Sequence, residues 1–189
     1  MSAPIIKEPL SPKLLDKFLS EYNLKLMAAL PWLNAAFGKA QQLKRYEDKK
    51  VIKYPGIYTG IKEDYINLFP CETFGNFSFW DVADPYTLEW VANQQQVIDA
   101  EFGLIFWMNL NNVLDFEQGR NLESIKSDIL QALDAIRVVN CRLTITSISE
   151  RAENIYKGYS IQEAENQFLM QPFAGLRFEG TIKAQTLCV

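Results

Sequence analysis

The last third of the chain holds the pattern that most limits its fold: an amphipathic helix followed by two alternating strands. Between residues 121 and 137, five apolar side chains recur at helical spacing and would form one face: Leu122, Ile125, Ile129, Leu133 and Ile136. Residues 141–148 and 176–186 then alternate apolar and polar, as strands with one buried face do. The pattern predicts an α/β (α+β) fold, in which a mainly antiparallel or mixed sheet is flanked by helices.

The remaining strand signals fit the same sheet. In 176–186 the side chains expected in the core are Leu176, Phe178, Ile182 and Ala184, and those expected in solvent are Arg177, Glu179, Lys183 and Gln185. Residues 97–110 are the most hydrophobic stretch, and they run continuously apolar from Phe102 to Met108. Such a run is typical of a central strand that is covered on both faces.

The N-terminal segment predicts an extended arm followed by a helical region. Prolines punctuate residues 1–11, which we expect to be extended, while 12–189 would form a single α/β domain. Ser11 as N-cap and Pro12 at the first helical position would open an amphipathic helix. That helix can pack in the core or lie across a neighbouring subunit.

Proline and glycine punctuate the region that follows. Pro31 would interrupt the first helix, and a second helical piece would continue to about residue 45. Residues 50–58 suggest a strand broken by the turn pair Pro55-Gly56, and 65–69 suggest a short extended piece. Residues 71–84 predict an aromatic-rich loop, which would form either a satellite core or an interface patch.

Composition and charge exclude several classes of protein. The 189 residues contain no histidine, which rules out Ser-His-Asp and Cys-His triads. A net charge of −4 argues against a protein that holds nucleic acid by neutralising phosphates. The one basic run is expected to be a solvated linker: Lys44, Arg45, Lys49, Lys50 and Lys53.

The cysteines and the N-terminus bear on the compartment. Three widely spaced cysteines (71, 141 and 188) form no CxxC pair, so we expect reduced thiols and neither a metal centre nor a disulfide framework. Cys141 is expected to be a small buried hydrophobe. The sequence shows no signal-peptide layout and no apolar run long enough to cross a bilayer, which predicts a soluble protein with no membrane partner.

We expect no enzyme and no cofactor. Three carboxylate pairs are candidates for acid–base chemistry, and all three are expected to be solvated: Glu63-Asp64, Asp81 with Asp84, and Glu163 with Glu165. The glycines form no phosphate-cradling motif. A ligand pocket enclosed by the sheet leaves no sequence signature, so a ligand-binding or enzymatic α/β domain stays open as an alternative.

A long polar excursion, residues 149–171, separates the last two strands. It would either fold down onto its own core or extend as a contact arm. Apolar and aromatic side chains in and beside it, together with one tryptophan from the 71–84 segment, are the candidate subunit-interface residues: Ile155, Tyr156, Tyr159, Phe168, Phe173 and Trp80.

The order of elements resembles that of bacteriophage tail-terminator or tail-completion proteins of the head–tail neck. The likeness covers residues 95–186. It rests on the helix-led start of the chain, the strand Phe102–Leu110, the helix Leu122–Ile136, the strand Leu143–Ile148, the segment Asn154–Tyr156 and the stretch Gln171–Ile182. The longer, more aromatic N-terminal hundred residues differ from the smallest members, which leaves open a different neck or baseplate role.

The resemblance implies a structural virion protein, made in the host cytoplasm, that forms a homo-oligomeric ring, typically a hexamer. Such a ring would cap the tail tube, dock it to the connector or neck proteins, and surround passing DNA without specific contacts. A subunit of a phage-like contractile injection machine would use the same ring-capping arrangement and is the alternative within this class.

Overall fold

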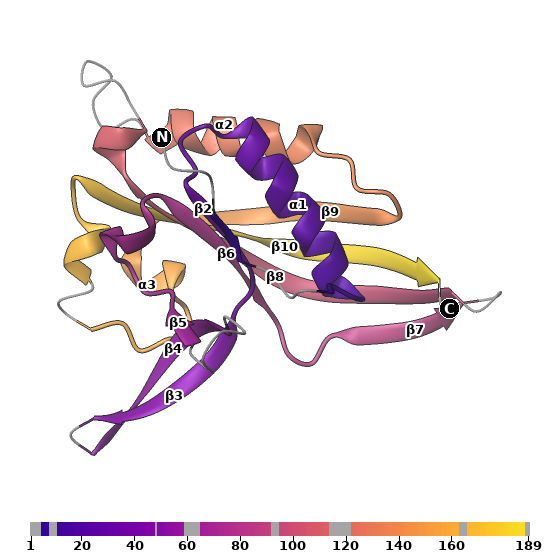
Figure 1. Cartoon of the computed structure of the whole chain (residues 1–189), viewed down its shortest axis with the longest axis horizontal. Coiled ribbons are helices and arrows are strands. Elements are labelled where there is room, and N and C mark those ends of the chain that lie inside the picture. The colour runs from indigo at the N-terminus through magenta and orange to yellow at the C-terminus, as the bar shows by residue number, and fades with distance from the viewer. Residues whose placement is uncertain are drawn as a thin grey trace.

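The computed structural model describes residues 5–7, 11–47, 49–58, 65–91, 95–113, 122–162 and 166–187. It shows a large twisted sheet with two helices on one face, and a small sheet with a projecting hairpin on the other (Figure 1). The mixed α/β class with an N-terminal helix, expected from the sequence, is confirmed.

The large sheet has seven strands in the order β1-β2-β6-β8-β10-β9, and β7 pairs with the N-terminal part of β8, residues 95–99. These strands are β1 (Ile5–Lys7), β2 (Ala35–Lys39), β6 (Phe77–Val82), β7 (Thr87–Val91), β8 (Gln95–Asn109), β9 (Cys141–Ser149) and β10 (Phe173–Leu187). β1 and β2 run parallel to their neighbours, and the other pairings are antiparallel. β8 and β10 pair along their whole 15-residue lengths, which makes them the spine of the sheet.

Helices α1 (Leu15–Ala29) and α2 (Leu122–Ala135) cover one face of this sheet. The stripe predicted for α2 is buried at Ile125, Ile129 and Leu133, against the even-numbered side chains of β10 such as Phe178. The predicted helix, central strand and core-facing side of the last strand are therefore confirmed. None of the described helices has the length and apolarity needed to cross a membrane.

The opposite face carries a second core under the small sheet and the excursion. The small sheet has the order β3-β4-β5, with β3 (Gln41–Glu47), β4 (Lys50–Tyr58) and β5 (Tyr65–Asn67). Short helical turns complete the layer: η1 (Glu72–Phe74), α3 (Ala152–Ile155) and η4 (Gln167–Leu169). A further turn, η2 (Leu110–Asn112), follows β8 and buries Leu110 in the core on the side of α1 and α2. Because β8 places Ile105 and Trp107 in this core and Leu104 and Phe106 in the other, both of its faces are covered.

The prediction of a second helical piece after Pro31 is wrong. Residues 35–39 form β2, with Ala36 in the helix-side core and Ala35 and Phe37 in the opposite core. A strand buried on both faces can show helical spacing by coincidence, and parallel pairing with β6 decides the conformation here. The first helix also begins at Leu15 rather than Pro12, because the chain turns at Leu14 with φ of 50°.

The basic run is a hairpin and not a linker. β3 and β4 pair over seven positions, from Gln41 opposite Gly56 to Glu47 opposite Lys50, and Figure 1 shows them projecting from the body. β4 also runs unbroken through Pro55-Gly56. A Cβ at Gly56 would lie 2.4 Å from the Leu43 Cδ1, so this glycine serves close packing of the hairpin and not a turn.

The aromatic segment 71–84 contains a buried strand, β6, where the sequence predicts a loop. β6 directs Phe77 and Phe79 into one core and Trp80 into the other, and all three are fully buried. With both faces covered, the segment lacks the alternation that would have marked it as a strand.

Candidate functional site

The excursion folds down onto the sheet, which decides between the two alternatives left by the sequence. We call its described residues, 150–162 and 166–171, the flap. Ile155 and Tyr156 are buried in the second core, where the Tyr156 ring packs 5.7 Å from Phe69 and its hydroxyl donates to the Leu68 carbonyl. Their side chains belong to the protomer's own interior.

Three other interface candidates line the rim of the same core. Tyr159, Phe168 and Phe173 are half-buried against it, and the Trp107 indole donates a 2.7 Å hydrogen bond to the Phe168 carbonyl. The structure thus brings together five of the six candidates on one face of the sheet.

Trp80 lies on the opposite face, and the expectation that it is available to a neighbour is wrong. Its side chain is 0% exposed, and its indole N–H donates to the Asn23 Oδ1 of α1 at 2.8 Å. The same correction applies to Ile155 and Tyr156, because a side chain enclosed within the protomer offers no surface to a partner.

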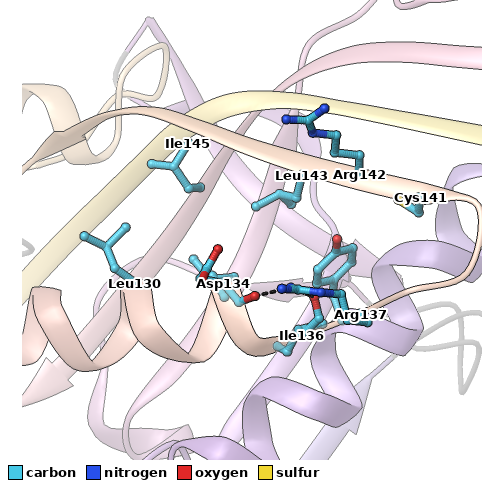
Figure 2. Close-up of a pocket in the computed structure, with 10 residues that line it drawn as sticks. Leu130, Asp134, Ile136, Arg137, Cys141, Arg142, Leu143 and Ile145 are labelled. Carbon is cyan, nitrogen blue, oxygen red and sulfur yellow. Dashed lines mark hydrogen bonds between the residues drawn. The ribbon is translucent and has the colours of Figure 1, made fainter.

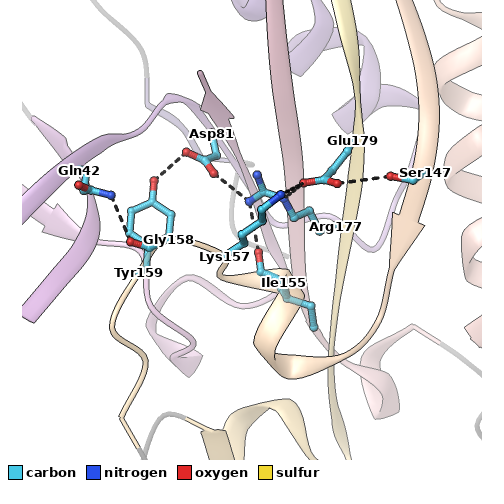
Figure 3. A network of polar contacts seen from close by, with 9 residues as sticks. All are labelled: Gln42, Asp81, Ser147, Ile155, Lys157, Gly158, Tyr159, Arg177 and Glu179. Atoms are coloured by element: carbon cyan, nitrogen blue, oxygen red, sulfur yellow. Dashed lines mark hydrogen bonds and ion pairs between the residues drawn. The ribbon is translucent and has the colours of Figure 1, made fainter. Parts of the chain in front are cut away.

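A cluster of ion pairs anchors the flap to the sheet (Figure 3). The buried guanidinium of Arg177 on β10 donates through Nη1 to Asp81 Oδ2 on β6 at 2.8 Å, and through Nε to Glu179 Oε1 at 2.9 Å. The Tyr159 hydroxyl donates to Asp81 Oδ1 at 2.9 Å, and Arg177 also reaches the Ile155 carbonyl at 3.4 Å. One cation therefore joins two strands of the sheet to the flap.

Arg177 lies across β8 because that strand has a glycine at the crossing. A Cβ at Gly103 would stand 2.3 Å from the Arg177 Cζ, closer than any side chain allows. The prediction that Arg177 faces solvent is wrong, since only 7% of the residue is exposed.

The flap is also bonded to the hairpin. Gln42 donates through Nε2 to the Gly158 carbonyl at 3.2 Å, and the backbone N–H of Ser160 donates to the Lys53 carbonyl at 2.7 Å. Gln162 donates through Nε2 to Glu47 at 3.3 Å. The flap therefore connects the hairpin to the Arg177 cluster on the sheet.

Two groups of the cluster, Tyr159 and Glu179, have pKa values shifted away from neutral pH. Burial, followed by the neighbouring Asp81 carboxylate, raises the pKa of Tyr159 well above its usual range, so this hydroxyl stays a donor. Partial burial alone would raise the pKa of Glu179, but the hydrogen bond and charge of Arg177 outweigh it and leave that pKa below its ordinary value. Neither group is poised to exchange protons near neutral pH.

We expect Glu179 to make folding acid-sensitive. Because its pKa is lower in the folded protein than its ordinary 4.5, its contribution to stability is complete above about pH 5. It begins to fall below pH 4.5 and is lost as the pH falls through the lower pKa of the folded state. Between about pH 5 and pH 3 the urea midpoint of the wild type should therefore fall more steeply than that of Glu179→Gln. Parallel curves for the two proteins would show that the carboxylate is not stabilised on folding.

A pocket of about 460 Å³ opens beside this cluster, lined by Asp81, Ala83, Glu101, Phe102, Thr146, Lys157, Arg177, Glu179, Gly180 and Thr181. Two of its three carboxylates, Asp81 and Glu179, already accept from Arg177, which leaves Glu101 without an acidic partner for general acid–base work. Among the described residues no group of three or more Cys, Asp or Glu side chains is placed to hold a metal ion. The other two carboxylate pairs considered above, 63–64 and 163 with 165, lie outside the described residues.

A second pocket, of about 500 Å³, lies between α2 and β9 (Figure 2). Its walls mix apolar side chains with charged ones, and the residues lining it include Leu130, Leu143, Asp134, Arg137 and Cys141. Arg137 donates to the backbone carbonyls of Asp134 and Ile136 at the end of α2, where a cation complements the helix dipole. These contacts of Arg137 cap the C-terminus of α2, and they place no reactive group in the pocket.

The thiol of Cys141 should be slow to react. Burial raises its pKa to about 12, so at pH 8 only about one thiol in ten thousand is ionised. In a Cys71→Ser/Cys188→Ser protein, alkylation by iodoacetamide should be slower by orders of magnitude in the folded state than in urea. Equal rates in the two states would show that this thiol is exposed and ionisable.

Sequence reasoning missed the Arg177 cluster, and the signal available for it was weak. In an alternating strand, Arg177 and Glu179 look like any two solvent-facing residues, and Asp81 falls in a segment whose sequence predicts a loop. Gly103, the one glycine inside the apolar run of β8, was the usable hint, because an isolated glycine in a strand marks a close approach.

No family model matches the chain, and no curated protein matches it in sequence.

Proposed function

We propose that this protein is a non-enzymatic structural component of a phage tail or head–tail neck, a ring-forming terminator that caps the tail tube and joins it to the connector. The observation that carries the proposal is the layout of residues 95–187. A long central strand, a covering helix and two returning strands form one continuous half-sheet, β8-β10-β9, under α2. This is the arrangement on which the family resemblance rests.

The polar groups of the described chain support a structural role. The buried Arg177 bonds to Asp81, and both residues bond to the flap, so they stiffen the protomer. Rigid protomers suit a closed ring, because each heterologous contact must repeat the same rotation for the ring to close.

The test is to determine the native mass of the purified protein by light scattering over a range of concentrations, and to image large species by negative stain. We expect a closed ring of about six copies that co-sediments with purified tail tubes and binds one of their ends. A protein that stays monomeric and also fails to bind tail tubes or connectors would refute the proposal. Binding to the tube of a contractile injection machine, and to no viral tail, would select the alternative within this class.

A further inference from the structure

We propose that the β3–β4 hairpin of one copy of this protein docks on strand β7 of a second copy, through a basic face on the hairpin and an acidic patch around β7. The inference rests on the proposed function only in that it names the contact by which a ring would form. The surfaces themselves are visible in the isolated protomer.

The outer face of the hairpin carries an uncompensated pair of like charges. Lys44 and Lys53 lie directly opposite each other on β3 and β4, both exposed, where two like charges destabilise a sheet. None of the ion pairs among the described residues includes either lysine. An anionic partner would relieve this repulsion.

Exposed apolar side chains stand next to the two lysines. Tyr46 is 80% exposed, and Val51 pairs with it across the strands and is 45% exposed. We call Lys44, Tyr46, Val51 and Lys53 the hairpin face. A tyrosine and lysines around an apolar spot fit a protein partner with acidic residues around an apolar patch of its own.

Strand β7 offers such a surface. All five of its residues are exposed, and they include Leu88 and Trp90, the latter 68% exposed, with Glu89 between them. Two more exposed carboxylates flank the strand, Asp84 before it and Glu101 on β8. Because side chains alternate along a strand, Leu88 and Trp90 lie on the helix side of the sheet, and Glu89, Val91 and Glu101 lie on the opposite side. The acidic side also carries an exposed apolar residue, Val91. We call Asp84, Glu89, Val91 and Glu101 the β7 patch.

The charges of the two regions are segregated along the molecule. Residues 41–58 carry five basic and two acidic side chains, a net +3, so the rest of a chain of net −4 carries −7. Figure 1 places the hairpin and β7 at opposite ends of the long axis. One copy cannot bring its two surfaces together, but successive copies can do so head to tail, which is a heterologous contact.

The backbone at both places is also available for pairing. β3 is an edge strand of the small sheet, and β7 pairs only with β8 among the described strands. Edge strands with exposed apolar side chains are the usual sites at which one chain adds to another. A second copy satisfies the charge, the exposed Val91 and the sheet edges at once, whereas a nucleic acid on the hairpin would leave Val91 and the free edge of β7 uncovered.

The experiment uses the full chain and two charge-reversed proteins, Lys44→Glu/Lys53→Glu in the hairpin face and Asp84→Lys/Glu89→Lys in the β7 patch. We expect the wild type to self-associate in light scattering and to dissociate as salt is added, because exposed charges are screened. Each reversed protein should associate at least about tenfold more weakly. An equimolar mixture of the two should recover association, since each hairpin face then meets a patch of opposite charge.

A matched control reverses two exposed lysines elsewhere, Lys13→Glu/Lys17→Glu at the start of α1, and should associate like the wild type. Circular dichroism melting curves, recorded on dilute protein, should be the same for all variants. A wild type that is monomeric at every concentration overturns the proposal, as does a mixture that does not recover. Loss of binding to a short DNA duplex in the hairpin variant, with self-association unchanged, would assign the hairpin to nucleic acid and also overturn it.

The outcomes separate this contact from the proposed function. Rings that form regardless of the hairpin and patch variants, and that still bind tail tubes, would refute the contact and leave the function standing. If association depends on both surfaces but the protein binds no tail tube or connector, the contact stands and the proposed function is refuted.

Discussion

Trp80→Ala should lower the free energy of unfolding by about 4 kcal/mol, the largest effect we expect from a single substitution in this chain. The indole is fully buried between α1 and the sheet, with ring centroids 5.3 Å from Phe102 and 6.0 Å from Tyr22. Alanine would leave a large cavity there and remove the N–H that donates to Asn23. Urea unfolding followed by circular dichroism measures the loss.

The matched control is Trp90→Ala, on a strand of the same sheet. Its side chain is mostly exposed, so at protein concentrations where the chain is monomeric the change should stay within about 0.5 kcal/mol. If Trp80→Ala does not fold, Trp80→Phe keeps most of the ring volume and should lose about 2 kcal/mol. A loss below about 1 kcal/mol for Trp80→Ala would contradict the burial described here.

Arg177→Met should cost about 3 kcal/mol, because it leaves Asp81 and Glu179 facing each other without the cation that joins them. The two carboxylates are partly exposed, at 22% and 31% of their side chains, so we place the cost at the lower end for a broken buried pair. The flap should loosen as well, since Arg177 reaches the Ile155 carbonyl and its partner Asp81 accepts from Tyr159.

Two measurements separate the local from the global effect in this variant. Urea midpoints give the loss in stability. In hydrogen exchange, the substitution should increase the exchange rates of the amides of 155–160 more than those of the amides of α2, each relative to the wild type. The control Arg142→Met removes an exposed arginine from the neighbouring strand and should change stability by less than about 0.5 kcal/mol. Unchanged exchange in the flap of Arg177→Met would mean that its apolar contacts alone hold it down.

Periodicity identified the elements that bury one face. The helix around Ile129 and the strand around Phe178 each show a single apolar side, so their patterns specify both the element and its orientation. The run at 102–108 was recognisable as a strand for a different reason, because it is long enough and apolar enough to need cover on both faces.

Periodicity failed where short strands are buried on both faces. Around Phe37 the apolar spacing matches a helix, and around Phe79 the aromatic residues follow Gly75-Asn76, which signals a turn. In both places the conformation is decided by pairing between β2 and β6, whose residues are about forty positions apart in the chain. Propensity and spacing hold no information about such a partner.

The candidate site was predictable only in part. The aromatic content of the excursion drew attention to Tyr156 and Phe168, which do gather on one face, but the same apolar character that marks an interface also marks a core. The Arg177 cluster depends on Asp81, 96 residues earlier, and no local pattern connects the two.

The flap fixes the orientation of the hairpin relative to the large sheet. It is bonded at one end to Arg177 on the spine of the sheet and at the other to Gln42 and Lys53 on the hairpin, which closes a triangle of sheet, flap and hairpin. A triangle resists bending, whereas a hairpin attached only at its base would pivot. Whatever the hairpin contacts is therefore held at one angle to the sheet, and in a chain of identical copies that angle would determine how many of them complete a circle.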